Sequence, residues 1–175
     1  WNSKISDWDS ITNKIPRFNT PGFDALSCIS SDGSKALVTI NTEACVKITT
    51  RGSDIFETKK SKRTGKFGTP RIIKNKTINT TFFEGAATIT KDNKTMYFVT
   101  DRNFEKKATD IWVVHKEGNK WGKAKALPDI INTSSRETTP FISENGKYLF
   151  FSSNGHVGMG GLDIYVSENK NILLY

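Results

Sequence analysis

Six acidic residues are the first candidates for chemistry in this chain. They fall into two sets, Asp24, Glu84 and Glu137, and Asp54, Asp110 and Asp163. Paired carboxyl groups could hydrolyse a glycosidic bond, one acting as acid and the other as base or nucleophile. A catalytic pair, however, occurs once per site, whereas these acids recur at matched positions along the chain. The recurrence favours a structural role, in which each acid accepts hydrogen bonds from backbone or hydroxyl groups between strands.

A glycine-rich loop is the second candidate. Four glycines lie within Gly155–Gly161, and such a loop could cradle a phosphate group. It lacks the Gly-Lys-Ser/Thr ending of a phosphate loop, and a strand-like run from Leu162 follows it instead of a helix. We therefore predict a tight turn before a structural strand.

The histidines and cysteines make no recognisable site. His115 and His156 have no nucleophile or base at a useful spacing, so we predict surface histidines. If Cys28 lies opposite Leu37 in a hairpin, Cys45 is eight residues further along, about 26 Å away in an extended chain. A disulfide needs Cα atoms within about 7 Å, which favours free thiols. We expect no metal site, no cofactor and no catalytic residue.

A basic stretch is the remaining candidate. The chain carries a net charge of +8, and the segment 57–76 holds eight Lys or Arg and one acid. Such a patch could hold nucleic acid, acidic glycan or a membrane surface, or it could be an ordinary solvated hairpin. The aromatic residue within it, Phe67, fills a position that repeats along the chain, which argues against nucleic acid. The candidate contact residues are Lys59, Lys60, Lys62, Arg63 and Lys66.

The elements that position these residues repeat three times. Each copy opens with Asn-Thr, at residues 19, 79 and 132, and has an acid five residues after the Asn. A turn pair follows, Asp32-Gly33, Asp92-Asn93 or Asn145-Gly146, and then an apolar strand. Further along come Asp-Ile-aromatic triplets beginning at Asp54, Asp110 and Asp163.

The pattern of each copy predicts four short strands. The turn pairs tolerate φ > 0 at both positions and predict two-residue type I′ hairpins. The strand after each turn is almost continuously apolar ("ALVTI", "MYFV", "YLFF"), which indicates burial on both faces. The triplets supply third strands. Weak fourth strands follow a Gly-flanked aromatic turn around Phe67 or Trp121, and Trp8 fits the same slot.

Four short strands per repeat predict an all-β chain, a β-propeller of four-stranded antiparallel blades with about three blades' worth present. Residues 1–18 supply the last strand of a preceding blade, 19–78 and 79–131 one blade each, and 132–175 an incomplete blade. Too few blades are present to close a ring, so the segment belongs to a larger propeller of about six. Isolated, it should self-associate, because apolar blade faces near Tyr148, Phe150 and Phe151 would meet water.

The third copy, "FISENGKYLFFSSNGHVGMGGLDIYVS", resembles the WD-like repeat of TolB-type propellers. It is most similar to the version in outer-membrane-protein-A-family envelope proteins of Bacteroidota, whose blade has Asn-Thr, an acid, Asp-Gly-Lys, an aromatic strand, a Gly-rich loop and Asp-Ile-Tyr. The second copy departs from this pattern at Asn93 and in its loop, and the first departs most.

The resemblance implies a non-enzymatic binding or scaffolding propeller of a bacterial envelope, periplasmic and associated with the outer membrane. It implies protein partners in a gliding or type IX secretion assembly, and contact with peptidoglycan through a domain absent from this segment. A propeller hydrolase or lyase acting on envelope glycan is the alternative. We expect no nucleic acid partner, and no apolar run is long enough to span a membrane.

Overall fold

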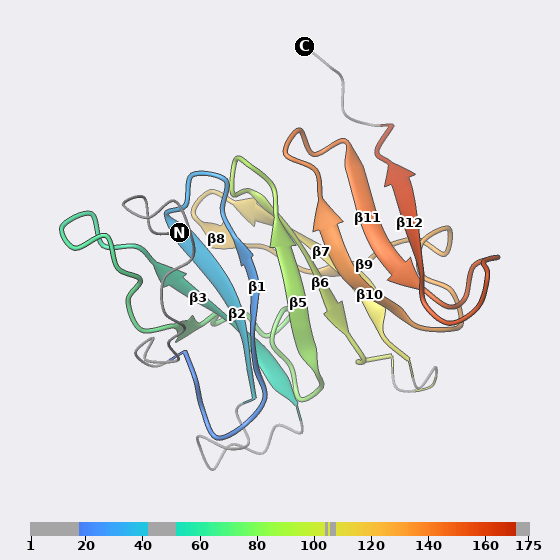
Figure 1. Ribbon diagram of the computed structural model, residues 1–175, viewed down its shortest axis with the longest axis horizontal. Helices are drawn as coiled ribbons and strands as arrows, with labels where there is room; N and C mark the ends of the chain where they lie inside the picture. Colours follow the sequence, from blue (N-terminus) through green and yellow to red (C-terminus); the bar gives the residue numbers. More distant parts are fainter. Residues whose placement is uncertain (1–17, 42–51, 104, 106–107, 171–175) are drawn as a thin grey trace, which may run out of the picture.

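The protein is built from β-strands alone wherever its structure is described, which confirms the predicted fold class. The computed structural model describes residues 18–41, 52–103, 105 and 108–170 (Figure 1). Within these ranges the strands form three antiparallel sheets. No helix in them is long and apolar enough to cross a membrane. Two predictions concern residues outside these ranges: the strand in 1–18, of which only Phe18 is described, with Trp8, and the loop holding Cys45.

Each sheet follows the chain in order. The first consists of β1 (Asp24–Ile29), β2 (Lys35–Asn41), β3 (Ser53–Lys59) and β4 (Arg71–Ile72). The second consists of β5 (Glu84–Ile89), β6 (Thr95–Thr100) and β7 (Asp110–Glu117), with β8 (Lys120–Trp121) and β9 (Lys125–Ala126) both paired to β7. The third consists of β10 (Glu137–Ile142), β11 (Tyr148–Ser153) and β12 (Asp163–Glu168).

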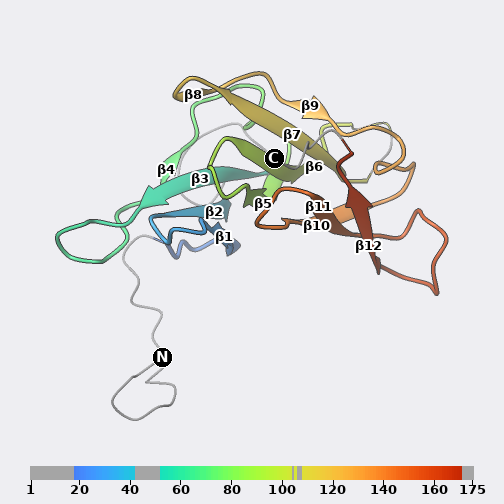
Figure 2. The same ribbon diagram turned by 90° about the horizontal axis from the view of Figure 1, so that it is seen from above.

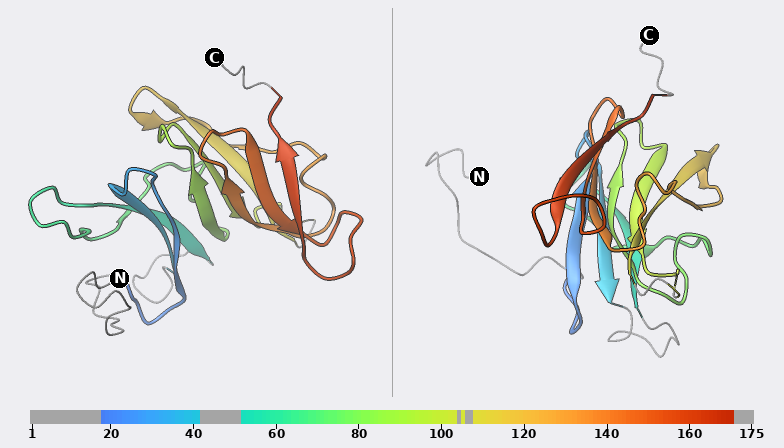
Figure 3. Two further views of the ribbon diagram at one scale, coloured as in Figure 1. Left: turned by 45° about the horizontal axis from the view of Figure 1, so that its top comes forward. Right: turned by 90° about the vertical axis from the view of Figure 1, so that its right-hand side faces the viewer.

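The sheets stack side by side as an open arc (Figure 3). Seen from above, the first strands β1, β5 and β10 lie closest together and the later strands fan outward (Figure 2). One apolar core fills the gap between the first and second sheets, around Leu37, Ile55 and Phe98. Another fills the gap between the second and third, around Val99, Ile111 and others. The sheets are therefore consecutive blades that do not close on themselves.

The turn type was predicted wrongly. Among the three turn pairs only the second residues have positive φ: 66° at Gly33, 58° at Asn93 and 72° at Gly146. The N–H of Gly33 donates to the Ser30 carbonyl, and the other two turns share this bond. This is a type I turn followed by one left-handed residue, a longer hairpin loop than the two-residue type I′ turn. Asp and Asn stay at ordinary φ because their side chains accept a backbone N–H two residues on, as Asp32 does from Ser34.

Burial of the middle strands depends on what lies beside them. β2 and β6 are buried on both faces, whereas β11 alternates, with Phe151 4% and Phe150 39% exposed. The prediction that all three would be buried on both faces is wrong for β11: β6 lies between two sheets, whereas β11 has a described sheet on one side only. Trp121 likewise lies in β8 and not in a turn; the turn is at Gly118, whose φ is 62°.

Candidate ligand-binding cleft and the repeated polar sites

The first set of acids accepts hydrogen bonds from the Asn-Thr motif of the same copy. Glu84 accepts the Thr80 N–H at 2.8 Å and the Thr80 hydroxyl at 2.6 Å. Glu137 accepts the same two groups of Thr133 at 3.0 and 2.6 Å, and Asp24 accepts both from Thr20. The carboxylates are thus already engaged at matched positions.

The two glutamates also join neighbouring strands. The Thr100 hydroxyl of β6 donates to Glu84 at 3.0 Å, and the Ser153 hydroxyl of β11 donates to Glu137 at 2.8 Å. Both glutamates are fully buried, and a buried carboxylate is tolerated when its oxygens are paired.

The asparagine of the second and third motifs contacts the preceding sheet. The Asn132 amide accepts the Ile111 N–H at 2.8 Å and donates to the carbonyls of Ile111 and Leu127, each at 2.9 Å. Asn79 makes the same three contacts with Ile55 and Ile73. Because Asn binds one sheet and Thr the next, the motif latches consecutive blades together.

The second set of acids lies at or next to the first residue of each third strand. Asp54 and Asp110 are buried, and Asp163 is half-buried and accepts the Met159 N–H at 2.9 Å. The structure therefore spreads the six acids over three sheets and gathers none of them in the cleft described below. The described part of the chain also has no cluster of three His, Cys, Asp or Glu that could hold a metal.

Arg102 lies at the centre of a buried polar site that was not predicted from the sequence. Its guanidinium donates to the carbonyls of Thr77 and Ile78, each at 2.7 Å, and lies 3.2 Å from Glu84 Oε1. It also lies over the rings of Phe98 and Trp112, at 5.6 and 4.3 Å from their centroids. Burial raises the pKa of the Glu84 carboxyl, and the Thr80 hydrogen bonds and the Arg102 charge oppose that rise.

His156 fills the same site one copy later, so its prediction as a surface histidine is wrong. Its Nε2 lies 3.0 Å from the Ile131 carbonyl oxygen. Its ring packs against Phe151 and Tyr165, with centroids 5.8 and 5.0 Å away. These partners stand at the repeat positions of Ile78, Phe98 and Trp112. His115, by contrast, is exposed.

The Gly155–Gly161 loop is shaped by this packing. A Cβ on Gly155 would lie 1.9 Å from the Thr133 hydroxyl oxygen, and one on Gly158 would lie 2.0 Å from Asp163 Oδ2. The Tyr165 hydroxyl donates to the carbonyls of His156 and Val157. Close backbone approach therefore accounts for these two glycines.

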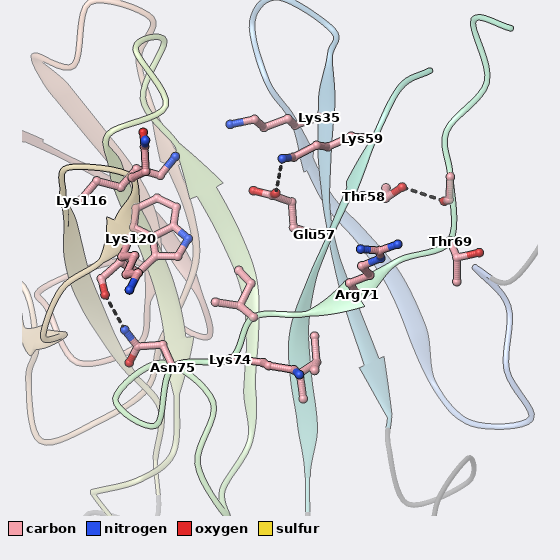
Figure 4. Close-up of a pocket in the computed structure, with 15 residues that line it drawn as sticks. Lys35, Glu57, Thr58, Lys59, Thr69, Arg71, Lys74, Asn75, Lys116 and Lys120 are labelled. Carbon is pink, nitrogen blue, oxygen red and sulfur yellow. Dashed lines mark hydrogen bonds and ion pairs between the residues drawn. The ribbon is translucent and has the colours of Figure 1, made fainter. Parts of the chain in front are cut away.

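A cleft of about 910 Å³ opens between the outer parts of the first two blades. Figure 4 shows Lys35, Lys59 and Arg71 on one side and Lys116 and Lys120 on the other. The Asn75 amide fixes the floor, since it donates to the carbonyls of Trp121 and Gly122 at 2.8 and 2.9 Å. The cleft therefore opens where the two blades diverge, and the Asn75 hydrogen bonds connect the blades at its base.

The cleft walls are strongly cationic. Six basic side chains line it against a single acid, Glu57, whose carboxylate lies 3.9 Å from the Lys59 ammonium. Burial lowers the pKa of Lys116, and the nearby Lys35 charge lowers it further. The basic residues are Lys35, Lys59, Arg71, Lys74, Lys116 and Lys120.

Of the five predicted contact residues only Lys59 lines this cleft, although Arg71 and Lys74 of the same basic stretch also line it. Lys60, Lys62, Arg63 and Lys66 lie in the exposed hairpin that joins β3 and β4. Lys35, Lys116 and Lys120 were not predicted from the sequence, because they lie at strand ends far from the basic stretch. Their spacing carries no signal along the chain.

Comparison with known proteins places the fold. A putative TolB from Agrobacterium tumefaciens is 21% identical, with a TM-score of 0.52, over 80% of this chain and 40% of that one. TolB from Acinetobacter baumannii is 20% identical, with a TM-score of 0.49, over 83% and 30%. A Hadza microbial sialidase is 9% identical, with a TM-score of 0.47, over 73% and 31%. No protein family and no curated protein matches the sequence. The chain therefore shares the TolB-type propeller fold and spans less than half of each solved chain.

Proposed function

We propose that the protein is a non-enzymatic binding or scaffolding propeller of a bacterial cell envelope. One observation carries the proposal: the recurring carboxylates are engaged in hydrogen bonds at matched positions, as in Glu84 and Glu137. The cleft that is open to a ligand offers cations and one paired acid instead of two free carboxyl groups. Such a site can bind an anionic ligand, but it lacks the two carboxyl groups that glycoside hydrolysis needs.

The TolB-type fold supports a place in the envelope. We propose a periplasmic protein associated with the outer membrane, working with protein partners in a gliding or type IX secretion assembly. Contact with peptidoglycan would come through a further domain. The motif resemblance to the envelope propellers of Bacteroidota motivates this part of the proposal.

Further blades complete the propeller in this proposal. Ile55 and Ile111 are fully buried against the following blade, whereas Ile164, at the same repeat position, is 80% exposed. Val166, Phe150 and Phe141 are exposed in the same sheet. An apolar sheet face of this kind drives association, and its natural occupant is another blade of the same protein. Replacing Ile164 with Ser should reduce self-association of the 175-residue chain, measured by light scattering; an unchanged scattering mass would contradict this.

Turnover is the test of the non-enzymatic role. The chain is incubated with envelope glycans and peptides, and products are measured by mass spectrometry. We expect no product above a heat-denatured control. Product that disappears in a single carboxylate variant, such as Asp163→Asn, would replace the binding propeller with a hydrolase or lyase. Crosslinking in cells then identifies the protein partners.

A further inference from the structure

The cleft between the first two blades has the charge of an anion-binding site. Six cations and one acid line it, and low-dielectric walls around charges of one sign focus the field and concentrate counter-ions. Of the cations, Arg71 presents a planar fork that matches a carboxylate or phosphate group. Its side chain and that of Lys120 are exposed, so both can reach a ligand.

The size and braced floor of the cleft suit an oligomer better than a lone ion. Its volume of about 910 Å³ lies near the upper end of small-ligand pockets, about 300–1,000 Å³. The contacts of Asn75 with Trp121 and Gly122 join the two blades beneath it. A site held on rigid elements loses little order when a ligand binds.

The lining also includes one half-buried aromatic ring among its charges. Trp121 lines the cleft, and the Lys116 ammonium lies 4.8 Å from the centroid of its ring. An aromatic ring in a cleft lined by cations and by the polar side chains of Asn119 and Thr69 can take a ring that is apolar on one face and hydroxylated at its rim. A sugar ring bearing a carboxylate or phosphate has that chemistry.

Two other polyanions fit less well. An extended acidic peptide would add to a strand edge, but the strands flanking the cleft, β4 and β8, have two residues each. Single-stranded nucleic acid stacks successive bases on several aromatic rings, and Trp121 is the one aromatic residue in the lining that the structure describes.

We infer that this cleft binds an acidic oligosaccharide, whose carboxylate or phosphate groups meet Arg71, Lys120 and the facing lysines while one sugar ring packs on Trp121. The inference rests on the proposed function as a binding propeller and names the ligand class of its cleft.

Calorimetric titration of the full chain tests the inference. The ligands are a tetragalacturonate, a phosphorylated oligomannose, a neutral galactose tetramer, a polyglutamate of equal charge and a short single-stranded DNA. One or both acidic sugars should bind at least about tenfold more tightly than the neutral tetramer and the polyglutamate, and which of the two binds identifies the anion. Binding should weaken as salt is raised. Equal or tighter binding of polyglutamate or DNA would overturn the glycan assignment, as would no binding of either sugar.

Charge-matched variants locate the site. Arg71→Glu with Lys120→Glu should weaken sugar binding about 100-fold, because each removes a charge-assisted contact. Lys62→Glu with Lys66→Glu makes the same change of net charge on the exposed hairpin and should weaken it by less than about threefold. Equal weakening by the two pairs would show that overall charge, and not the cleft, holds the sugar. A chain that binds sugar but also cleaves it would refute the non-enzymatic function and leave this inference standing. A chain that neither binds nor cleaves would refute the inference alone.

Discussion

Replacing Arg102 with alanine should be among the most damaging single changes in the second blade. The substitution removes donors to the Thr77 and Ile78 carbonyls and the partner of Glu84. The Arg102 side chain is 12% exposed and that of Glu84 0%. Water therefore cannot replace the lost contacts without opening the blade.

The magnitude follows from this burial. Breaking a buried pair by removing one partner costs about 3–5 kcal/mol, because the remaining charge is uncompensated. The exposed pair between Lys91 and Glu144, with both side chains 65% exposed, provides the control. Lys91→Ala should cost less than about 1 kcal/mol.

Urea unfolding monitored by tryptophan fluorescence measures both variants, with stability taken from the linear dependence on urea. Arg102→Lys separates charge from geometry, since the ammonium keeps the charge but loses the planar fork; it should fall between wild type and Arg102→Ala. A loss below about 1 kcal/mol for Arg102→Ala would refute the view that this pair is a buried structural site.

The pH dependence of the free energy of unfolding also tests this buried pair. Burial raises the folded-state pKa of Glu84 above its ordinary value of 4.5, so the folded state holds this proton more tightly than the unfolded state. Its contribution to stability is complete below about pH 4.5 and is lost as pH rises through the folded-state pKa. Without the Arg102 charge that pKa rises further. The deficit of Arg102→Ala should therefore shrink as pH falls from 7 toward 4.5, and a constant deficit would contradict this.

Three further predictions concern two of the other repeated sites and the thiol of Cys28. Asn132→Ala should cost about 3 kcal/mol in urea unfolding, since three hydrogen bonds between blades are lost; a cost under 1 kcal/mol would rule out a latch. His156→Ala should cost about 2 kcal/mol through its hydrogen bond and ring packing, while the exposed His115→Ala stays within about 0.5. Burial raises the pKa of the Cys28 thiol to about 11, so in a Cys45→Ser variant iodoacetamide at pH 8 should label it about 100-fold more slowly before unfolding than after; equal rates would place Cys28 at the surface.

The sequence by itself determined the all-β class and the order of the strands. Repeated spacing between Asn-Thr, an acid, a turn pair and an Asp-Ile-aromatic triplet reports local backbone geometry, and hairpins are local. The pairing of Cys28 opposite Leu37 followed from the turn position alone, and the register agrees. The turn type could not be predicted in this way. Asp and Asn are compatible with a type I′ turn and also with a type I turn followed by a left-handed residue, and only the longer loop distinguishes the second from the first.

Only the tertiary structure decided which side chains lie together between the blades. Arg102 and His156 look unrelated in sequence, yet they fill equivalent sites in consecutive blades because an aromatic pair at matching repeat positions lies against each of them. Lys35 and Lys116 belong to separate blades. They line the same cleft only because of the angle at which the two sheets diverge. That angle is set by the core between the sheets, to which residues from both contribute. No spacing along one strand encodes it, so the cleft could not be read from the sequence.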